Sequence, residues 1–84
     1  MDVKESKEFA KQMKKIKDKM TRERIFKQIR KLIKNPESGD LLSYEKGIRK
    51  LYIPPFRLLY SYKNNRIYLM CFDHRSKIYK KLRS

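Results

Sequence analysis

Residues 48–72 read IRKLYIPPFRLLYSYKNNRIYLMCF, and this stretch decides the fold class of the chain. Apolar and polar side chains alternate along its first two segments, 48–53 and 56–63, which is the period-two pattern of a strand with two different faces. Pro54-Pro55 separates these segments because neither proline can donate a hydrogen bond to a ladder. Asn64-Asn65 suits a hairpin turn because asparagine tolerates positive φ, and the nearly continuous apolar run after it is typical of a central strand. The stretch therefore predicts an antiparallel meander.

The chain before residue 36 has the periodicity of helices. One apolar stripe follows Ser6, a residue type favoured at an N-cap, and a second follows Thr21, which is interpreted as the N-cap of the next helix. The two stripes consist of Phe9, Met13, Ile16 and Met20, and of Ile25, Ile29, Leu32 and Ile33. Steps of three and four place each stripe on one face of a helix, and both stripes are expected to lie in the core. Asn35-Pro36 ends the second helix because a residue before proline is pushed out of the α region.

Helices followed by strands predict an α+β fold, in which an N-terminal helical hairpin packs on one face of a small antiparallel β-sheet. A chain of 84 residues suits one such domain, spanning 1–84. Residues 1–5 form either a very short strand or a frayed end, and residues 76–82 either a last helical turn or a short edge strand. If the apolar faces of the strands meet the helices, the other face carries a basic surface with interleaved aromatic rings. Its members are Lys50, Tyr52, Arg57 and Lys63.

The charge of the chain indicates an anionic partner. Lys and Arg number 24 against nine Asp and Glu, a net charge of +15, and such self-repulsion destabilises a free protein. Glu45 and Asp73 are the only acidic residues after position 42, so the positive field belongs mainly to the C-terminal half. Nucleic acid is the leading candidate because phosphate neutralisation releases counterions. An acidic protein or an anionic membrane is the alternative.

Several classes of protein are excluded. Cys71 is the only cysteine, so no intramolecular disulfide forms. One cysteine and one histidine cannot supply the ligands of a zinc site, and no cofactor motif is present. The longest apolar runs are far shorter than the roughly 20 residues that a membrane-spanning helix needs. A cytoplasmic protein without metal or cofactor is expected.

The order and spacing of these motifs resemble the RelE/ParE superfamily of toxins from toxin–antitoxin systems. The resemblance rests on a basic strand, a tight turn, an aromatic-Arg pair, an apolar strand ending in tyrosine, and a late His-Arg-x-x-aliphatic-Tyr. Here these are Lys50–Ile53, Pro54-Pro55, Phe56-Arg57, Leu58–Tyr60 and His74-Arg75-Ser76-Lys77-Ile78-Tyr79. The resemblance implies a RelE-like microbial RNase-type fold. It also implies a ribosome-dependent endoribonuclease that cuts mRNA in the A site, without metal, through attack by the RNA 2′-hydroxyl. A cognate antitoxin and the ribosome with its mRNA are the implied partners.

Carried over by position, the resemblance implies four catalytic residues, Lys50, Arg57, Arg75 and Tyr79. The position of Tyr52 is usually basic in the family, so this residue departs from the pattern. Residues expected to contact RNA are Arg49, Tyr52, Lys63, His74, Lys77 and Lys80. Guanidinium groups can bind a phosphate bidentately and stabilise the charge that develops on it. The general base and acid remain open among Lys50, Tyr79 and His74.

Two other functions remain open. The first is a ParE-like toxin that poisons DNA gyrase without nuclease activity, and the second is a non-catalytic RNA-binding or ribosome-binding module. A pair of helices lying on a membrane surface is a weaker alternative, because each helix is better used as part of the core.

Overall fold

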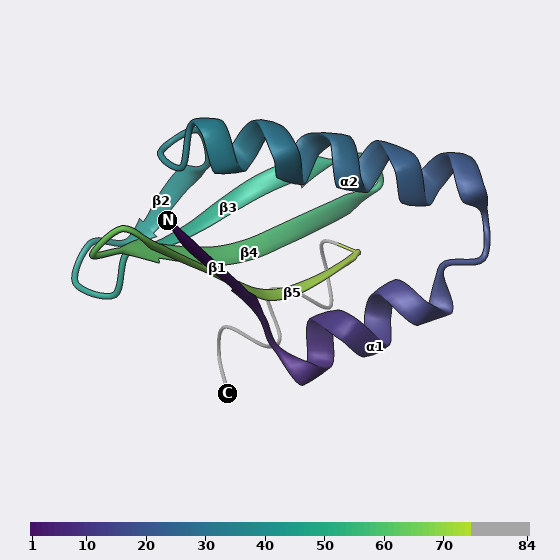
Figure 1. Cartoon of the computed structure of the whole chain (residues 1–84), viewed down its shortest axis with the longest axis horizontal. Helices are drawn as coiled ribbons and strands as arrows, with labels where there is room; N and C mark the ends of the chain where they lie inside the picture. Colours follow the sequence, from purple (N-terminus) through teal and green to yellow (C-terminus); the bar gives the residue numbers. More distant parts are fainter. Residues whose placement is uncertain (75–84) are drawn as a thin grey trace.

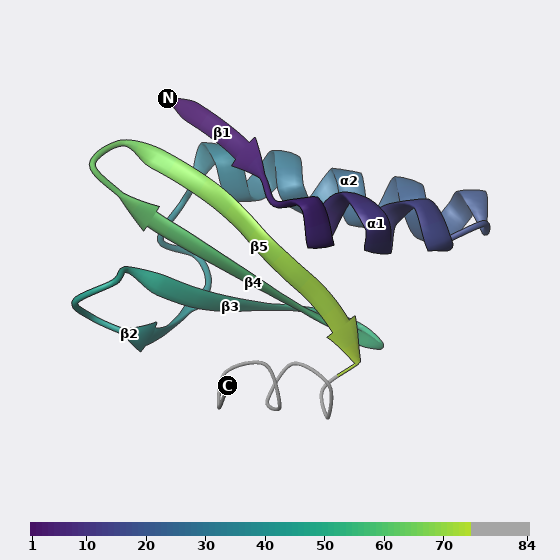
Figure 2. The same ribbon diagram turned by 90° about the horizontal axis from the view of Figure 1, so that it is seen from below.

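The computed structural model describes residues 1–73 in full and the backbone of His74. Its elements are β1 (Asp2–Glu5), α1 (Lys7–Lys15), α2 (Lys19–Lys34), β2 (Asp40–Ser43), β3 (Ile48–Ile53), β4 (Phe56–Lys63) and β5 (Arg66–His74). The five strands form one sheet in the order β1-β5-β4-β3-β2. The helices run in opposite directions on the same side of this sheet (Figure 1, Figure 2). The predicted α+β class, with a helical hairpin on one sheet face, is confirmed.

The central strands β3, β4 and β5 form the predicted antiparallel meander. Asn64 and Asn65 have φ values of 54° and 60°, as a hairpin turn with two left-handed residues requires. Pro54-Pro55, a cis peptide, joins β3 to β4. The pairing between β4 and β5 shifts by one residue at Met70. This bulge places Cys71 on the face opposite Leu69, because an extra residue reverses the alternation of side chains beyond it.

Both ends of the sheet add strands to the meander. β1 pairs in parallel with β5, so residues 2–5 form the short strand rather than a frayed end. The outer side of β5 is then bonded by the segment that leads into α1. The Ser6 N–H donates to the Leu69 carbonyl at 2.9 Å, the Ser6 hydroxyl donates to the Met70 carbonyl, and the Phe72 N–H donates to Oε1 of Gln12 at 2.8 Å. At the opposite edge lies β2, which the sequence pattern did not predict.

The helices differ from the predicted ones at the connection between them. Ser6 caps α1 as predicted and accepts a bond from the Phe9 N–H. α1 ends at Lys15, however, and α2 begins at Lys19 with Asp18 as its N-cap, so the assignment of Thr21 as N-cap was wrong. The Asp18 carboxylate accepts bonds from the N–H and hydroxyl of Thr21, and the hydroxyl bond lowers the pKa of Asp18. Met20 therefore starts a new helix and is 79% exposed, which corrects its placement in the core.

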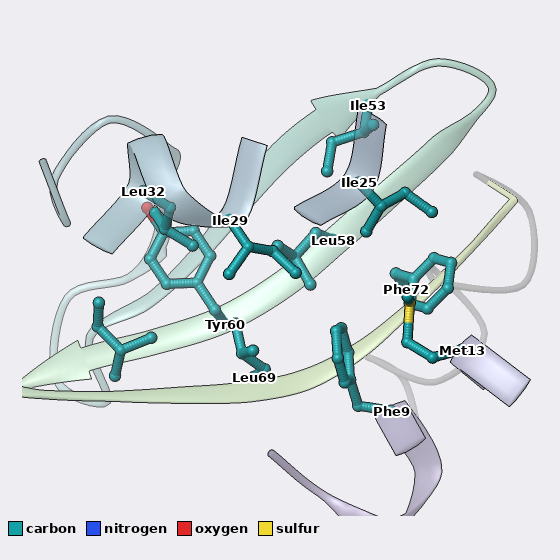
Figure 3. Close-up of a cluster of buried hydrophobic side chains, with 11 residues drawn as sticks. Phe9, Met13, Ile25, Ile29, Leu32, Ile53, Leu58, Tyr60, Leu69 and Phe72 are labelled. Carbon is teal, nitrogen blue, oxygen red and sulfur yellow. The ribbon is translucent and has the colours of Figure 1, made fainter. Parts of the chain in front are cut away.

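The core lies between the helices and the sheet (Figure 3). Its buried members are Phe9, Met13, Ile25, Ile29, Leu32, Ile53, Leu58, Tyr60, Ile67, Leu69 and Phe72. Phe72 meets Phe9 and Phe56 edge to face, with ring centroids 5.4 and 5.5 Å apart. Within the described residues no helix is long and apolar enough to cross a membrane.

The buried Tyr60 hydroxyl fixes the loop between α2 and β2. It accepts a bond from the Gly39 N–H at 2.9 Å and donates one to the Pro36 carbonyl at 2.8 Å. Burial raises the pKa of this hydroxyl because the phenolate would lose its hydration. The Arg49 guanidinium holds the same loop from β3, donating to the carbonyls of Glu37 and Gly39 at 3.0 and 2.8 Å.

Candidate nucleic-acid interface

The candidate site lies on the sheet face that points away from the helices. We call this face of the sheet the open face. Alternation along β3 and β4 turns Lys50, Tyr52 and Arg57 away from the core, as the sequence predicts. The register places Tyr52 and Arg57 directly opposite each other on adjacent strands. On the other side of Arg57, its register partner in β5 is Asp73. Arg57 thus stands between a tyrosine and a carboxylate at the end of the sheet next to the β3–β4 turn.

Arg57 and Tyr52 form a stacked pair. The guanidinium carbon lies 3.6 Å from the centroid of the Tyr52 ring, well within the range of a cation–π contact. Tyr52 is 55% exposed, whereas Arg57 is half-buried. The guanidinium therefore has one face against the ring at the surface of the sheet.

Lys50 brings a second cation to the same area. Its partner in β4 is Leu59, which makes Arg57, two residues earlier in that strand, its diagonal neighbour. Diagonal neighbours on one face of an antiparallel pair are about 7–8 Å apart, a distance that long side chains span. Lys50 is half-buried. Its ammonium and the Arg57 guanidinium can therefore both reach one anionic group above the sheet.

A small apolar cluster lies beneath these cations. Leu59 and Cys71 are 1% and 4% exposed, and Met70 packs against them. Leu59 lies on the open face through the alternation of β4, and Cys71 joins it there because of the bulge at Met70. Cys71 is thus a buried free thiol in an apolar setting.

Two of the residues expected to contact RNA lie apart from Arg57. Arg49 points to the helix side of the sheet, where it bonds the α2–β2 loop. Lys63 follows Arg57 by six residues along β4, which corresponds to about 20 Å in a strand, and its ammonium donates to the Glu45 carbonyl at 2.7 Å. Their contribution to RNA binding stays a prediction, but the structure does not bring either side chain to Lys50 and Arg57.

The C-terminal part of the candidate site is only partly described. The backbone of His74 ends β5 opposite Phe56, beside the same end of the sheet as Arg57. Arg75, Lys77, Tyr79 and Lys80 lie outside the described residues, and their assignments stay predictions.

Two features of the site are not indicated by the sequence motifs. Asp73, one of the few acidic groups in this half of the chain, is the register partner of Arg57. Counting residues outward from the Asn64-Asn65 turn would pair Arg57 with Phe72 instead, because the bulge at Met70 is not visible in the sequence. The stacking of Tyr52 on Arg57 follows from the pairing of β3 with β4. This pairing can be predicted from the sequence by counting equal numbers of residues outward from the Pro54-Pro55 turn. No cluster of three or more His, Cys, Asp or Glu side chains suited to a metal ion occurs among residues 1–73.

Comparison with known proteins places this geometry in context. A family model described as the ParE toxin of the type II toxin–antitoxin system parDE matches residues 3–79. The fold is similar to that of a chain in the intact E. coli RelBE toxin–antitoxin complex, with a TM-score of 0.73 and 15% identity over 87% of this chain and 94% of the other. It is also similar to a chain of the chromosomal ParDE system of P. aeruginosa, with a TM-score of 0.69 and 21% identity over 88% and 95% of the two chains. E. coli YafQ gives a TM-score of 0.69 and 19% identity over 93% and 97%. No curated protein sequence matches the chain.

Proposed function

The chain belongs to the RelE/ParE superfamily of toxins of type II toxin–antitoxin systems, and on this premise we propose that it is a ribosome-dependent mRNA endoribonuclease. The observation that carries the proposal is the pairing of Lys50 and Arg57 as diagonal neighbours on the open face. A toxin that acts only by binding has no need of this pair together with the sequence motif His74-Arg75. The proposed reaction takes place in the ribosomal A site.

The proposed chemistry is a transesterification within the RNA. The 2′-hydroxyl loses its proton to a base and its oxygen attacks the adjacent phosphorus. The bond from phosphorus to the 5′-oxygen breaks, and the leaving oxygen takes up a proton. The products are a 2′,3′-cyclic phosphate and a 5′-hydroxyl. Charge builds on the phosphate oxygens in the transition state, and fixed cations aimed at that charge supply the largest share of such catalysis.

Arg57 is the proposed electrostatic stabiliser. Its guanidinium stands on a strand of the sheet and stacks on a ring, so its orientation is fixed before substrate binds. Guanidinium N–H groups match two phosphate oxygens at once, which an ammonium group cannot do. Lys50 supplies a second positive charge to the same phosphate.

The proton transfers are assigned from the sequence motif. Lys50, Tyr79 and His74 are the groups from which the base and acid are drawn, and Arg75 adds a further cation. The backbone of β5 brings the chain to the end of the sheet beside Arg57 immediately before Arg75. Lys63, Lys77 and Lys80 are proposed to contact the RNA backbone.

The proposed protein partner is a cognate antitoxin that holds the toxin inactive. Solved structures with this fold include toxin–antitoxin complexes, among them RelBE of E. coli and the RelB–RelE complex of Methanococcus jannaschii. The ribosome with its mRNA is the proposed target, and the net charge of +15 favours this polyanion.

Cell-free translation tests the proposed function. The protein is added to a translating extract and the 5′ ends of the mRNA are mapped at nucleotide resolution. Cuts at fixed positions within codons, bearing 5′-hydroxyls and absent without ribosomes, are expected. Intact mRNA together with salt-sensitive binding to ribosomes or RNA would instead identify a non-catalytic binding module.

A second candidate function is a ParE-like poison of DNA gyrase. It is favoured by the family model, which describes ParE toxins, and by Tyr52, which stands where a basic residue is usual in RelE-like toxins. Incubation with gyrase, ATP and supercoiled plasmid distinguishes the two. Protein-dependent linear DNA after detergent treatment, with mRNA left intact, would establish the gyrase activity and refute the nuclease.

A further inference from the structure

Tyr52 has a specific geometric relation to the proposed phosphate-binding arginine. The two residues are register partners on β3 and β4, and the guanidinium carbon lies over the ring, 3.6 Å from its centroid. One face of the tyrosine is therefore already occupied by an internal cation.

We propose that Tyr52 is a positioning residue for Arg57, holding the guanidinium in the orientation that binds an RNA phosphate. The inference rests on the proposed function, because it assigns a role within the same site. It changes the role of Tyr52 from a direct RNA contact to a support that acts through Arg57.

The physical reason lies in the shape of the guanidinium. Stacking uses one of its flat faces, whereas its N–H donors point outward in the plane of the group. A ring beneath it therefore restricts rotation of a long side chain without consuming any donor. Pre-organising the fork in this way leaves less side-chain entropy to lose when phosphate binds.

The departure from a basic residue at position 52 follows from the same contact. A lysine there would place a like charge directly opposite Arg57, and like charges in cross-strand pairs are destabilising. Tyrosine offers the negative face of its ring instead. With tyrosine at position 52, the site has one positive charge fewer than with lysine, but its Arg57 guanidinium is better ordered.

A mutant cycle in RNA binding tests the proposal independently of cleavage. The probe is a short single-stranded RNA with 2′-O-methyl groups, which cannot be cut, titrated at low salt. Tyr52→Leu is expected to weaken binding about three- to tenfold, the usual cost of ordering one long, rotamer-rich side chain on binding, and Tyr52→Phe to recover most of this loss. In an Arg57→Ala background, Tyr52→Leu should cost less than about twofold because the group it positions is gone.

The matched control is Tyr44→Leu. Tyr44 is 88% exposed and lies in the turn between β2 and β3, outside the strands that carry Tyr52 and Arg57 on the open face. Its replacement should change binding less than about twofold. An equal loss from Tyr52→Leu with and without Arg57 would mean that the ring contacts RNA directly and would overturn the proposal. No loss in the wild-type background, or no binding by the wild type, would overturn it as well. Should the cycle behave as expected while mRNA stays uncut in translating extracts, the nuclease proposal fails and the positioning role stands.

Discussion

Replacing Tyr60 by Phe isolates the contribution of one buried hydroxyl to the fold. The ring of Tyr60 is fully buried in the core, and phenylalanine fills the same space without a cavity. The change removes only the oxygen, which accepts a bond from the Gly39 N–H and donates one to the Pro36 carbonyl. Gly39 is itself buried, so its N–H is left without this partner.

The expected cost follows from those two bonds. An unsatisfied buried donor costs about 1–3 kcal/mol, so a loss of about 2 kcal/mol in the free energy of unfolding is expected for Tyr60→Phe. For a chain of this length that corresponds to a decrease in Tm of roughly 8–16 °C. Urea unfolding followed by circular dichroism measures the change, and the m-value should stay constant because the exposed area does not change.

The same hydroxyl gives the stability a dependence on alkaline pH. Burial raises the pKa of Tyr60 above its ordinary value of 10.0, so the folded state keeps the proton at pH values where the unfolded chain has lost it. Stability from this group is complete below pH 10 and falls as the pH rises from there through the folded pKa. Tyr60→Phe lacks this titration, so the difference in stability between the two proteins should narrow above pH 10.

Tyr44→Phe is the matched control, because Tyr44 is 88% exposed. It should change stability by less than about 0.5 kcal/mol. Equal stabilities for Tyr60→Phe and the wild type at neutral pH would refute the view that this hydroxyl fixes the α2–β2 loop.

Four further substitutions test the packing described above. Gly39→Ala should destabilise the fold by about 1–3 kcal/mol, as measured by urea unfolding, because a Cβ there would meet the Tyr60 oxygen at 2.6 Å and the Lys50 carbonyl at 2.9 Å; a neutral result would contradict this close approach. Ser6→Ala should cost about 1–2 kcal/mol in thermal unfolding, since the residue both caps α1 and bonds β5, and an unchanged Tm would count against that double role. Met20→Gln should stay within about 0.5 kcal/mol of the wild type, whereas Met13→Ala should cost about 2–5 kcal/mol; a large loss at Met20 would restore it to the core.

The regular parts of the fold were predictable because periodicity reports which face is buried. Alternation in 48–53 and 56–63 correctly separated Leu58 from Arg57, and the paired asparagines identified their hairpin. The connection between the helices was not predictable from the apolar stripe. Met20 continues the spacing of Phe9 and Met13, but Asp18 starts a new helix and turns the methionine outward.

The strands at the edges and the bulge carry weaker signals. β2 is a short edge strand with Leu41 and Leu42 both exposed, so it shows no alternation to recognise. The bulge at Met70 lies inside a continuous apolar run. Because this run shows no alternation of apolar and polar residues, its sequence does not reveal where the two faces exchange. The positive charge of Arg49 fits an RNA-binding residue, and only the position of the α2–β2 loop shows that its guanidinium bonds two carbonyls there.

The most direct test of the proposed nuclease compares two arginine replacements in a translating extract. Arg57→Ala removes the stacked guanidinium from the open face. Arg66→Ala removes the same charge from an exposed position at the other end of the sheet, where its guanidinium is 3.7 Å from Asp2. We expect Arg57→Ala to lower the rate of mRNA cleavage by about 10²–10³-fold while its circular dichroism spectrum stays that of the folded protein, and Arg66→Ala to cut at close to the wild-type rate. Equal cleavage rates for the two variants would contradict the assignment of the open face as the catalytic surface.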